Sequence, residues 1–345
     1  MERTQRINGF TLLKLIAAFQ VFYLHIVVHL DLNQYKIYSI PVISKVLSPF
    51  QGVPIFFVIS GYFIWKSLSA RNISIKEYIT HRFTRIFPEL WIVVGLTALA
   101  VFVFEFKHIS LGAFAAWIIT QSTVMQFWTP DCLRSFGVGC PNGALWTITV
   151  FVQFYIVVFL LHKALHNKRN FAWGGVLLLY ILANVLPGLV QDRLPETLYK
   201  LYQQTVFPYL LVFMYGAFIA EFENAFSKII QNKWVTVILY IILAAGLPFD
   251  LKGAGYAVFR TALVAVFAIS FGYTVKCNLI RQDISYELYL VHMPILNVFL
   301  ELGSQKNWIT FFCVLGVTLI LSVILYHINQ IIIRRSDARV KRYIR

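Results

Sequence analysis

The chain has 345 residues, of which 59% are hydrophobic, and its mean hydropathy is +0.71. A soluble domain of this length would not be so apolar. Runs of about 20 apolar residues, the length that crosses a bilayer core of about 30 Å, recur along the whole sequence. No stretch is long and polar enough to form a separate soluble domain. We therefore predict an all-α integral membrane protein with one domain over residues 1–345.

The formal net charge of +15 is explained by where the cations lie. Twenty of the 30 lysines and arginines fall in six segments, and eight fall in the loops between them. The positive-inside rule places the basic segments in the cytoplasm, together with both termini. These segments are 1–9, 66–85, 162–170, 221–233, 276–283 and 334–345. Since membrane topology accounts for the charge, we expect no nucleic-acid partner.

Ten apolar runs are candidate membrane spans. In chain order they are 10–30, 50–68, 86–104, 143–161, 171–190, 206–222, 234–250, 255–275, 284–302 and 308–332. The first follows a basic start but precedes no small-residue cleavage site, so we expect a span there and not a signal peptide. The run 109–128 is also apolar, but if it crossed, 162–170 would lie outside. We expect a re-entrant or interfacial helix on the outer side there, in a bundle of about ten helices with N-in/C-in topology.

The first span carries Lys14 near its inner end and His25 about 16 Å further out along a helix. A histidine in apolar sequence is costly unless it has a partner or a task. His25 and His29 share a helix face, a spacing that could hold a metal ion, but no third ligand is near in sequence and we expect no metal. His25 is either a catalytic or a structural, hydrogen-bonded histidine. His29 lies nearer the outer interface, where we expect it to be solvated.

The second span and the inner loop that follows it hold further polar residues. Ser60 and Tyr62 interrupt an apolar run and either pack against another helix or line a substrate channel. Arg82 and Arg85 are three apart, so on a helix they point the same way. Two guanidinium groups side by side suit an anion, either the phosphates of a nucleotide or lipid headgroups. Glu89, one turn on, could instead pair with Arg85.

Polar residues of the later spans complete the candidates. Trp146 begins the fourth span at the outer interface, where aromatic residues anchor helices, and Gln153 is expected to face the bundle. His292 lies within the ninth span and needs a partner there. In the outer loop before the fourth span, seven residues separate Cys132 from Cys140. In an oxidising compartment these two form a disulfide, and otherwise they are free thiols; the sequence leaves both open.

Together these segments resemble the membrane acyltransferase-3 family, the bacterial enzymes that O-acylate surface polysaccharides. Lys14 and His25 match the spacing of a basic residue, usually arginine, and a histidine in that family's first span. Arg82 and Arg85 match its R-x-x-R pair, which is linked to acyl-CoA binding. Three further elements match in order: F-F-V-I-S-G-Y at 56–62, the stretch from L-W-T-I to Q-F-Y at 145–155, and S-Y-E-L-Y-L-V-H-M-P at 285–294.

The resemblance implies an acyl-CoA-dependent O-acyltransferase in the bacterial cytoplasmic membrane. The donor would be acetyl-CoA or another acyl-CoA, with no permanently bound cofactor. The acceptor would be a cell-surface or lipid-linked polysaccharide on the outer side, and membrane lipids would be the remaining partners. His25 is then the catalytic residue, and Lys14, Arg82 and Arg85 bind acyl-CoA. The channel or acceptor contacts are Ser60, Tyr62, Trp146, Gln153 and His292.

Two alternatives stay open at this point. One is a non-enzymatic carrier or flippase for a lipid-linked glycan, which would give no reason for the spacing of Lys14 and His25. The other is a family member that transfers succinyl or acts on a small molecule or lipid. Many family members also carry acids just before Q-F-Y, where this chain has Phe151 and Val152. The sequence therefore shows no acidic partner that would orient His25.

Overall fold

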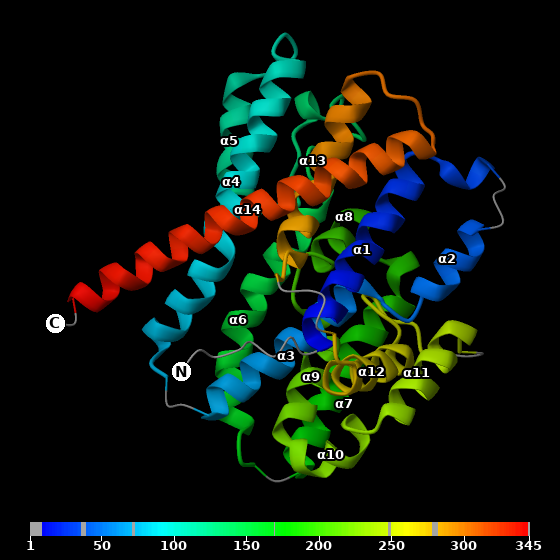
Figure 1. Ribbon diagram of the computed structural model, residues 1–345. Coiled ribbons are helices and arrows are strands. Elements are labelled where there is room, and N and C mark those ends of the chain that lie inside the picture. Colours follow the sequence, from blue (N-terminus) through cyan, green and yellow to red (C-terminus); the bar gives the residue numbers. More distant parts are fainter. Residues whose placement is uncertain are drawn as a thin grey trace. The chain divides into compact units, whose positions relative to one another are not determined.

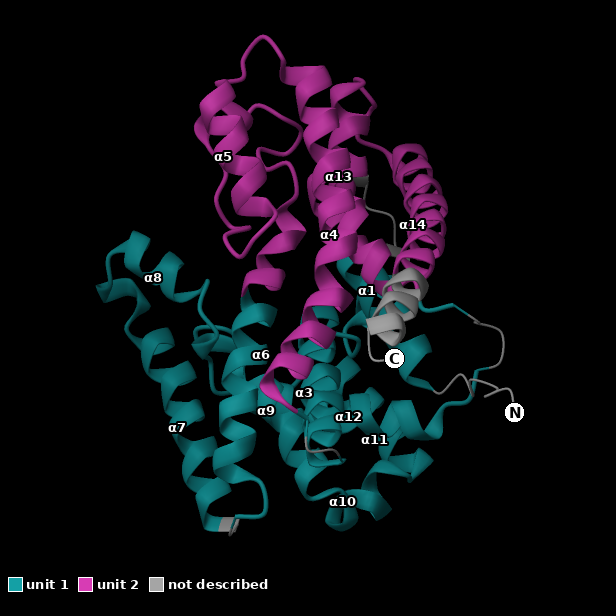
Figure 2. Ribbon diagram, turned by 90° about the vertical axis from the view of Figure 1, so that its left-hand side faces the viewer, with its two compact units in different colours: residues 1–21, 38–73, 150–283 teal, residues 22–37, 74–149, 284–345 magenta. Residues whose placement is uncertain are grey.

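A computed structural model describes residues 9–35, 39–70, 73–168, 170–247, 250–277 and 282–343, and its regular elements there are all helices (Figure 1). The predicted all-α class is confirmed. The chain divides into two compact units (Figure 2). Unit 1 holds residues 1–21, 38–73 and 150–283, and unit 2 holds 22–37, 74–149 and 284–345. The basic N-terminal residues before Gly9 lie outside the described residues, as do the side chains of 333–345.

Two helices contribute to both units: α1 (Gly9–His29) and α6 (Trp146–Leu165). The other helices of unit 1 are α2 (Ser39–Leu47), α3 (Gly52–Ala70), α7 (Asn170–Leu189), η4 (Gln191–Arg193), α8 (Glu196–Tyr202), α9 (Phe207–Glu221), α10 (Glu223–Ile230), α11 (Lys233–Ala245) and α12 (Val258–Thr274). Those of unit 2 are η1 (Leu32–Tyr35), α4 (Ile75–Glu105), α5 (Leu111–Gln121), η2 (Asp131–Leu133), η3 (Gly143–Leu145), α13 (Ser285–Glu301) and α14 (Trp308–Tyr343).

Seven helical segments of the described chain are long and apolar enough to cross a membrane, or eight if the bent pair α10–α11 counts as one span. Each predicted span contains an apolar helix. Four of those helices are short, however: α9 has 15 residues, α11 has 13, and α12 and α13 have 17 each. Several helices of the described chain could therefore cross a membrane, while the count of ten stays a prediction. The run 109–128 forms α5, whose 11 residues are fewer than the roughly 20 that a span needs.

Helices α3 and α9 of unit 1 approach each other closely through a pair of glycines. A Cβ atom on Gly61 would overlap the carbonyl oxygen of Phe213, and one on Gly216 would overlap that of Val58. Small residues at such positions let two membrane helices bring their backbones together, which replaces the hydrophobic driving force that lipid does not provide. The interruption of the apolar run near Ser60 is thus a packing feature at Gly61.

Helix α13 forms the buried centre of unit 2 and contains Pro294. Proline has no N–H, so the carbonyl of Leu290, four residues earlier, loses its helical donor. The side chain of Asn142 supplies the missing bond, with its Nδ2 atom donating to the Leu290 carbonyl over 2.9 Å. The loop before α6 is thereby tied to the middle of α13.

The same loop is tied to the C-terminal half of α13 by Asn297, which is fully buried. Its Nδ2 atom donates to the carbonyls of Cys140 and Pro141 over 2.9 and 3.0 Å, and its Oδ1 accepts from the N–H of Val138. Cys132 and Cys140 are both free cysteines in this structure, which is one of the two alternatives that the sequence leaves open. Hydrogen bonds to α13 hold this loop in shape without a disulfide.

The glycine contact gives a test of the α3–α9 packing. Gly61→Ala should lower the free energy of unfolding by about 1–3 kcal/mol, because the added methyl group has no space beside the Phe213 carbonyl. Gly95→Ala in α4 is the matched control, since nothing lies within 4 Å of a Cβ there. Thermal unfolding of the purified protein in detergent compares the two. Equal melting temperatures for both variants would contradict the packing.

Topology is tested by labelling single cysteines in a background without the four natural ones. A membrane-impermeant thiol reagent applied from outside should modify Arg134→Cys, in the loop at 129–142, and spare Lys168→Cys, in the basic segment 162–170. Both positions are exposed, so access to the reagent depends on the side of the membrane. Reversed labelling would overturn the N-in/C-in arrangement.

Candidate active site

His25 and His292 meet in unit 2. Nδ1 of His25 lies 2.9 Å from Nε2 of His292, and the two ring centroids are 5.1 Å apart. His292 is fully buried and His25 is half-buried. The rings of Phe22 and Tyr289 pack around His292, with centroids 6.2 and 6.0 Å from that of its imidazole. The structure thus brings together two of the predicted site residues, 267 positions apart in the chain.

The hydrogen bonds of this pair assign the proton positions. Nδ1 of His292 lies 3.2 Å from the carbonyl oxygen of Leu288, which can only accept, so this Nδ1 carries the proton. Nε2 of a neutral His292 then has a lone pair and accepts the Nδ1 proton of His25. A neutral His25 that donates through Nδ1 keeps the lone pair on its own Nε2. The partner that orients His25 is therefore a second histidine and not an acid.

The N-terminal half of α13 packs against α4 beside the two arginines. The hydroxyl of Tyr286 donates to the carbonyl of Ile86 over 3.1 Å. Glu89 and Glu287 are both buried and share a hydrogen bond, and Glu89 also accepts from Nδ2 of Asn329. Among the described residues, Glu89 is therefore engaged with α13 and α14 and forms no ion pair with Arg85. The two residues are thus not in ion-pair contact, although the charge of Arg85 acts on the Glu89 carboxylate.

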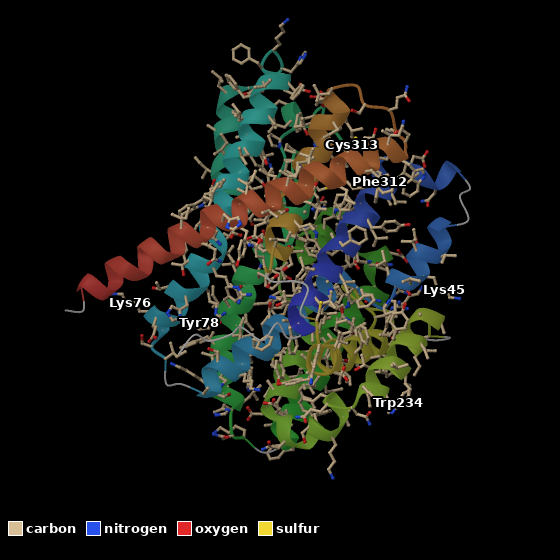
Figure 3. All side chains as sticks on the ribbon, in the orientation of Figure 1. Lys45, Lys76, Tyr78, Trp234, Phe312 and Cys313 are labelled. Carbon is tan, nitrogen blue, oxygen red and sulfur yellow. The ribbon has the colours of Figure 1, made fainter. Side chains whose placement is uncertain are left out.

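Arg82 and Arg85 lie on one helix, as predicted, in the first third of α4. Ser74 caps this helix by accepting the N–H of Glu77 over 3.2 Å. The guanidinium carbon of Arg82 lies 5.3 Å from the ring centroid of Tyr78, and Figure 3 labels Tyr78 at this end of α4. Arg85 is exposed. The pair thus offers one stacked and one exposed guanidinium group.

Lys14 belongs to unit 1, where it forms an ion pair with Asp283. The acid lies just before α13 in sequence, and nothing in the first span predicted this pairing. The ammonium group of Lys14 is therefore already matched by a carboxylate in the absence of a ligand.

Tyr62 takes part in a polar cluster of unit 1 that sequence reasoning missed. Its hydroxyl donates to Glu223 over 2.8 Å and lies 2.7 Å from the hydroxyl of Tyr273. Lys66, one turn further along α3, forms an ion pair with Glu223 at 2.7 Å. The only signal for this cluster was a lysine and a glutamate that each end an apolar run on the predicted cytoplasmic side.

The other predicted contacts have local roles. Gln153 donates to the carbonyl of Gln204 over 2.9 Å and accepts the N–H of Val206 over 2.8 Å, so both ends of its amide hold the start of α9. Ser60 is half-buried on α3 in unit 1. Trp146 is the first residue of α6 and belongs to unit 2, where the neighbouring Thr147 bonds the Tyr289 hydroxyl at 2.9 Å.

Comparison with known proteins identifies the family of this chain. Residues 7–327 match the acyltransferase-3 family model, described as an acyltransferase domain. Nodulation protein 10 of Rhizobium leguminosarum bv. viciae is 28% identical over 87% of this chain and 86% of its own length. The exopolysaccharide production protein ExoZ of Rhizobium meliloti is 26% identical over 84% of this chain and 90% of its own length.

The peptidoglycan O-acetyltransferase OatA of Listeria monocytogenes is 27% identical over 31% of this chain and 19% of its own length. No solved structure matches. The family match covers nearly the whole chain, including both helices of the histidine pair and the arginine pair on α4. The protein is a multi-pass membrane protein that belongs to the acyltransferase-3 family.

Proposed function

We propose that the protein transfers an acyl group from cytoplasmic acyl-CoA, with acetyl as the proposed group. The acceptor is a hydroxyl group of a surface or lipid-linked polysaccharide on the outer side of the bacterial cytoplasmic membrane. The observation that carries the proposal is the histidine pair, which leaves the lone pair of His25 Nε2 as a base. The names of ExoZ and OatA support a polysaccharide acceptor and an acetyl group.

Helix α13 relates the donor site to the base. Tyr286 bonds the backbone next to Arg85, and His292 lies six residues, or about 9 Å of helix rise, further along. Acyl-CoA phosphates held by Arg82 and Arg85 would leave the pantetheine arm to run outward along this helix. The thioester would then reach the level of His25, where an acceptor entering from outside could meet it.

The chemistry at His25 is general-base catalysis. Nε2 takes the proton of the acceptor hydroxyl while the hydroxyl oxygen attacks the thioester carbonyl carbon. Collapse of the tetrahedral intermediate breaks the C–S bond, and the imidazolium proton passes to the departing CoA sulfur. During the reaction the positive charge on His25 is stabilised by the lone pair of His292 Nε2, which accepts the Nδ1 proton. His292 is in this scheme a positioning residue.

The histidine pair predicts a graded loss of activity. His25→Gln should lower acyl transfer by 10²-fold or more while acyl-CoA binding stays near wild type, because the phosphates are held elsewhere. His292→Ala should lower kcat and leave the KM for acyl-CoA unchanged. His292→Gln should recover part of that loss, since its amide oxygen can accept the Nδ1 proton.

These variants are measured in nanodiscs by release of CoA thiol from acetyl-CoA and by mass analysis of the acylated glycan. A stable and active His25→Gln enzyme would refute the mechanism. Absence of any thiol release by the wild-type protein would favour the carrier or flippase alternative.

The arginine pair predicts a separate loss of donor binding. Arg82→Gln and Arg85→Gln should each weaken acetyl-CoA binding about tenfold or more, the effect of losing a hydrogen bond to a charged group. Lys76→Gln is the matched control, because Lys76 is an exposed cation two turns earlier on the same helix. Equilibrium binding of labelled acetyl-CoA measures the effect. Unchanged affinity in both arginine variants would assign the pair to lipid headgroups.

A further inference from the structure

Helix α14 carries polar residues on the one face that it buries in unit 2. Between positions 311 and 332 its buried residues recur every three or four positions, so they share one side of the α-helix. They are Phe311, Val314, Thr318, Ser322, Leu325 and Asn329. Other sides of the helix are apolar and exposed, as at Ile320 and Ile324, which suits contact with lipid. Polar residues inside a membrane are costly and are kept where they have a partner or a function.

The C-terminal part of this face reaches the helix of the arginine pair. Helix α14 packs against both α13 and α4 within unit 2, and Figure 2 shows the three helices in that unit. Asn329 donates through Nδ2 to the carboxylate of Glu89 on α4. Glu89 lies four residues, or about one helical turn, after Arg85. Asn329 therefore contacts α4 next to the proposed site of the donor phosphates.

The N-terminal part of the same face reaches the surroundings of the histidine pair. The ring of Phe311 packs against that of Phe22, with centroids 5.5 Å apart, and the ring of Phe22 packs against that of His292. Thr318 follows Phe311 in the chain and precedes Asn329, so it lies between the two ends of the face. The buried face of α14 thus connects the proposed donor site with the proposed base.

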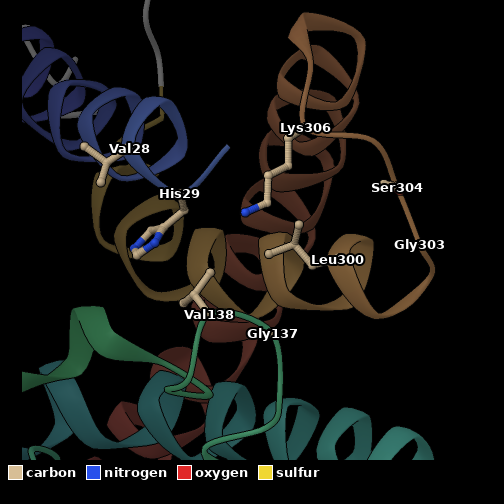
Figure 4. Close-up of a pocket in the computed structure, with 8 residues that line it drawn as sticks. All are labelled: Val28, His29, Gly137, Val138, Leu300, Gly303, Ser304 and Lys306. Carbon is tan, nitrogen blue, oxygen red and sulfur yellow. The ribbon is translucent and has the colours of Figure 1, made fainter. Parts of the chain in front are cut away.

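A cavity of about 590 Å³ lies on the other side of the histidine pair (Figure 4). It opens in unit 2 at the C-terminal ends of α1 and α13, and its lining includes His29, Gly137, Val138 and Leu300. The ring centroid of His29 is 6.3 Å from that of His25. Along α13, His292 lies between Tyr286, which bonds the arginine-bearing helix, and Leu300. A donor held by the arginine pair therefore approaches the base from the side away from this cavity, where α14 packs.

Two polar atoms on the buried face of α14 have no hydrogen-bond partner among the described residues: Oγ1 of Thr318 and Oδ1 of Asn329. Thr318 is fully buried, and Asn329 is 8% exposed. A hydroxyl group inside a helix can donate to the carbonyl four residues earlier, as Ser322 does to Thr318 and Thr97 does to Val93, but Thr318 does not. Native structures leave few buried polar atoms unsatisfied, and a bilayer offers no water to replace a missing partner.

The pantetheine arm of acyl-CoA has the polar groups that these atoms lack. It is a narrow chain that carries two amides and one hydroxyl group between apolar carbons. An amide N–H or the hydroxyl can donate to Asn329, and Thr318 can accept from an N–H or donate to an amide carbonyl. The two residues are about 16 Å apart along the helix, so one water molecule cannot satisfy both, whereas an extended ligand can.

We infer that the buried face of α14 binds the pantetheine arm of acyl-CoA through hydrogen bonds to Asn329 and Thr318. The inference rests on the proposed function, which it deepens by naming residues that hold the donor between its phosphates and its thioester. Thr318 and Asn329 then distinguish acyl-CoA from nucleotides that lack the arm.

Equilibrium binding to the full chain in nanodiscs tests this inference with two probes. Acetyl-CoA has the arm, and 3′-phospho-ADP has the same nucleotide but ends at the diphosphate. Wild-type protein should bind acetyl-CoA more tightly. Thr318→Val should lower the affinity for acetyl-CoA about three- to tenfold, the effect of losing one neutral hydrogen bond, and leave that for 3′-phospho-ADP unchanged. Thr318→Ser keeps the hydroxyl group and should keep the affinity.

Thermal unfolding separates a binding role from a structural one. Valine has nearly the shape of threonine, so Thr318→Val should keep or raise the melting temperature of the ligand-free protein, because it removes an unsatisfied hydroxyl group. Thr97→Val is the matched control: its buried hydroxyl is already satisfied within α4, and this variant should bind both probes as the wild type does. Asn329→Leu should weaken binding of acetyl-CoA alone by a similar factor, although it also lowers the melting temperature because Glu89 loses a donor.

Unchanged affinity for acetyl-CoA in Thr318→Val, or an equal loss for both probes, would overturn the inference. Acyl transfer by a wild-type protein whose Thr318→Val variant binds acetyl-CoA normally would refute this binding face alone. Arm-dependent binding of acetyl-CoA that is weakened in Thr318→Val, by a protein that transfers no acyl group, would refute the proposed function alone.

Discussion

The hydrogen bond between His25 and His292 is the constraint on which the candidate site depends. It joins α1 to α13 inside unit 2 and, through the Leu288 carbonyl, decides which nitrogen of each ring carries a proton. A base in an apolar setting needs a defined tautomer, because the wrong one would present an N–H to the acceptor hydroxyl. A carboxylate is the usual partner that fixes the tautomer of such a base. A second buried histidine achieves the same orientation here without placing another charge in the membrane.

Helix α13 can hold His292 in place because the helix is fixed along its whole length. Tyr286 bonds α4 at the N-terminal end, Asn142 satisfies the carbonyl that Pro294 leaves without a donor, and Asn297 binds the loop before α6. Backbone groups inside a bilayer must be satisfied by protein, so the proline and the asparagine form a matched pair. The same contacts that position the histidine also shape the wall of the cavity at 137–138.

Unit 1 is held by different means. Gly61 and Gly216 let α3 and α9 come close together, and the Lys66–Glu223 pair with Tyr62 and Tyr273 forms a polar cluster near the end of α3. This cluster, and the hydrogen bonds of Gln153 to the start of α9, account for two residues that looked like candidates for a channel. Tyr62 and Gln153 have their polar atoms engaged with other parts of unit 1, which is what buried polar groups require.

The sequence by itself determined the helical class, the membrane location and the family motifs. These depend on apolar run length and on residue spacing along one helix, as for His25 and His29 or Arg82 and Arg85, and both are properties of a one-dimensional pattern. It could not show which helices pack together, and so it left His25 without a partner and Lys14 without Asp283. Only the tertiary structure brought His292 to His25, left the two loop cysteines unbridged and formed the cavity at His29. Hydrogen-bond partners are chosen by the packing of distant segments, which local periodicity does not encode.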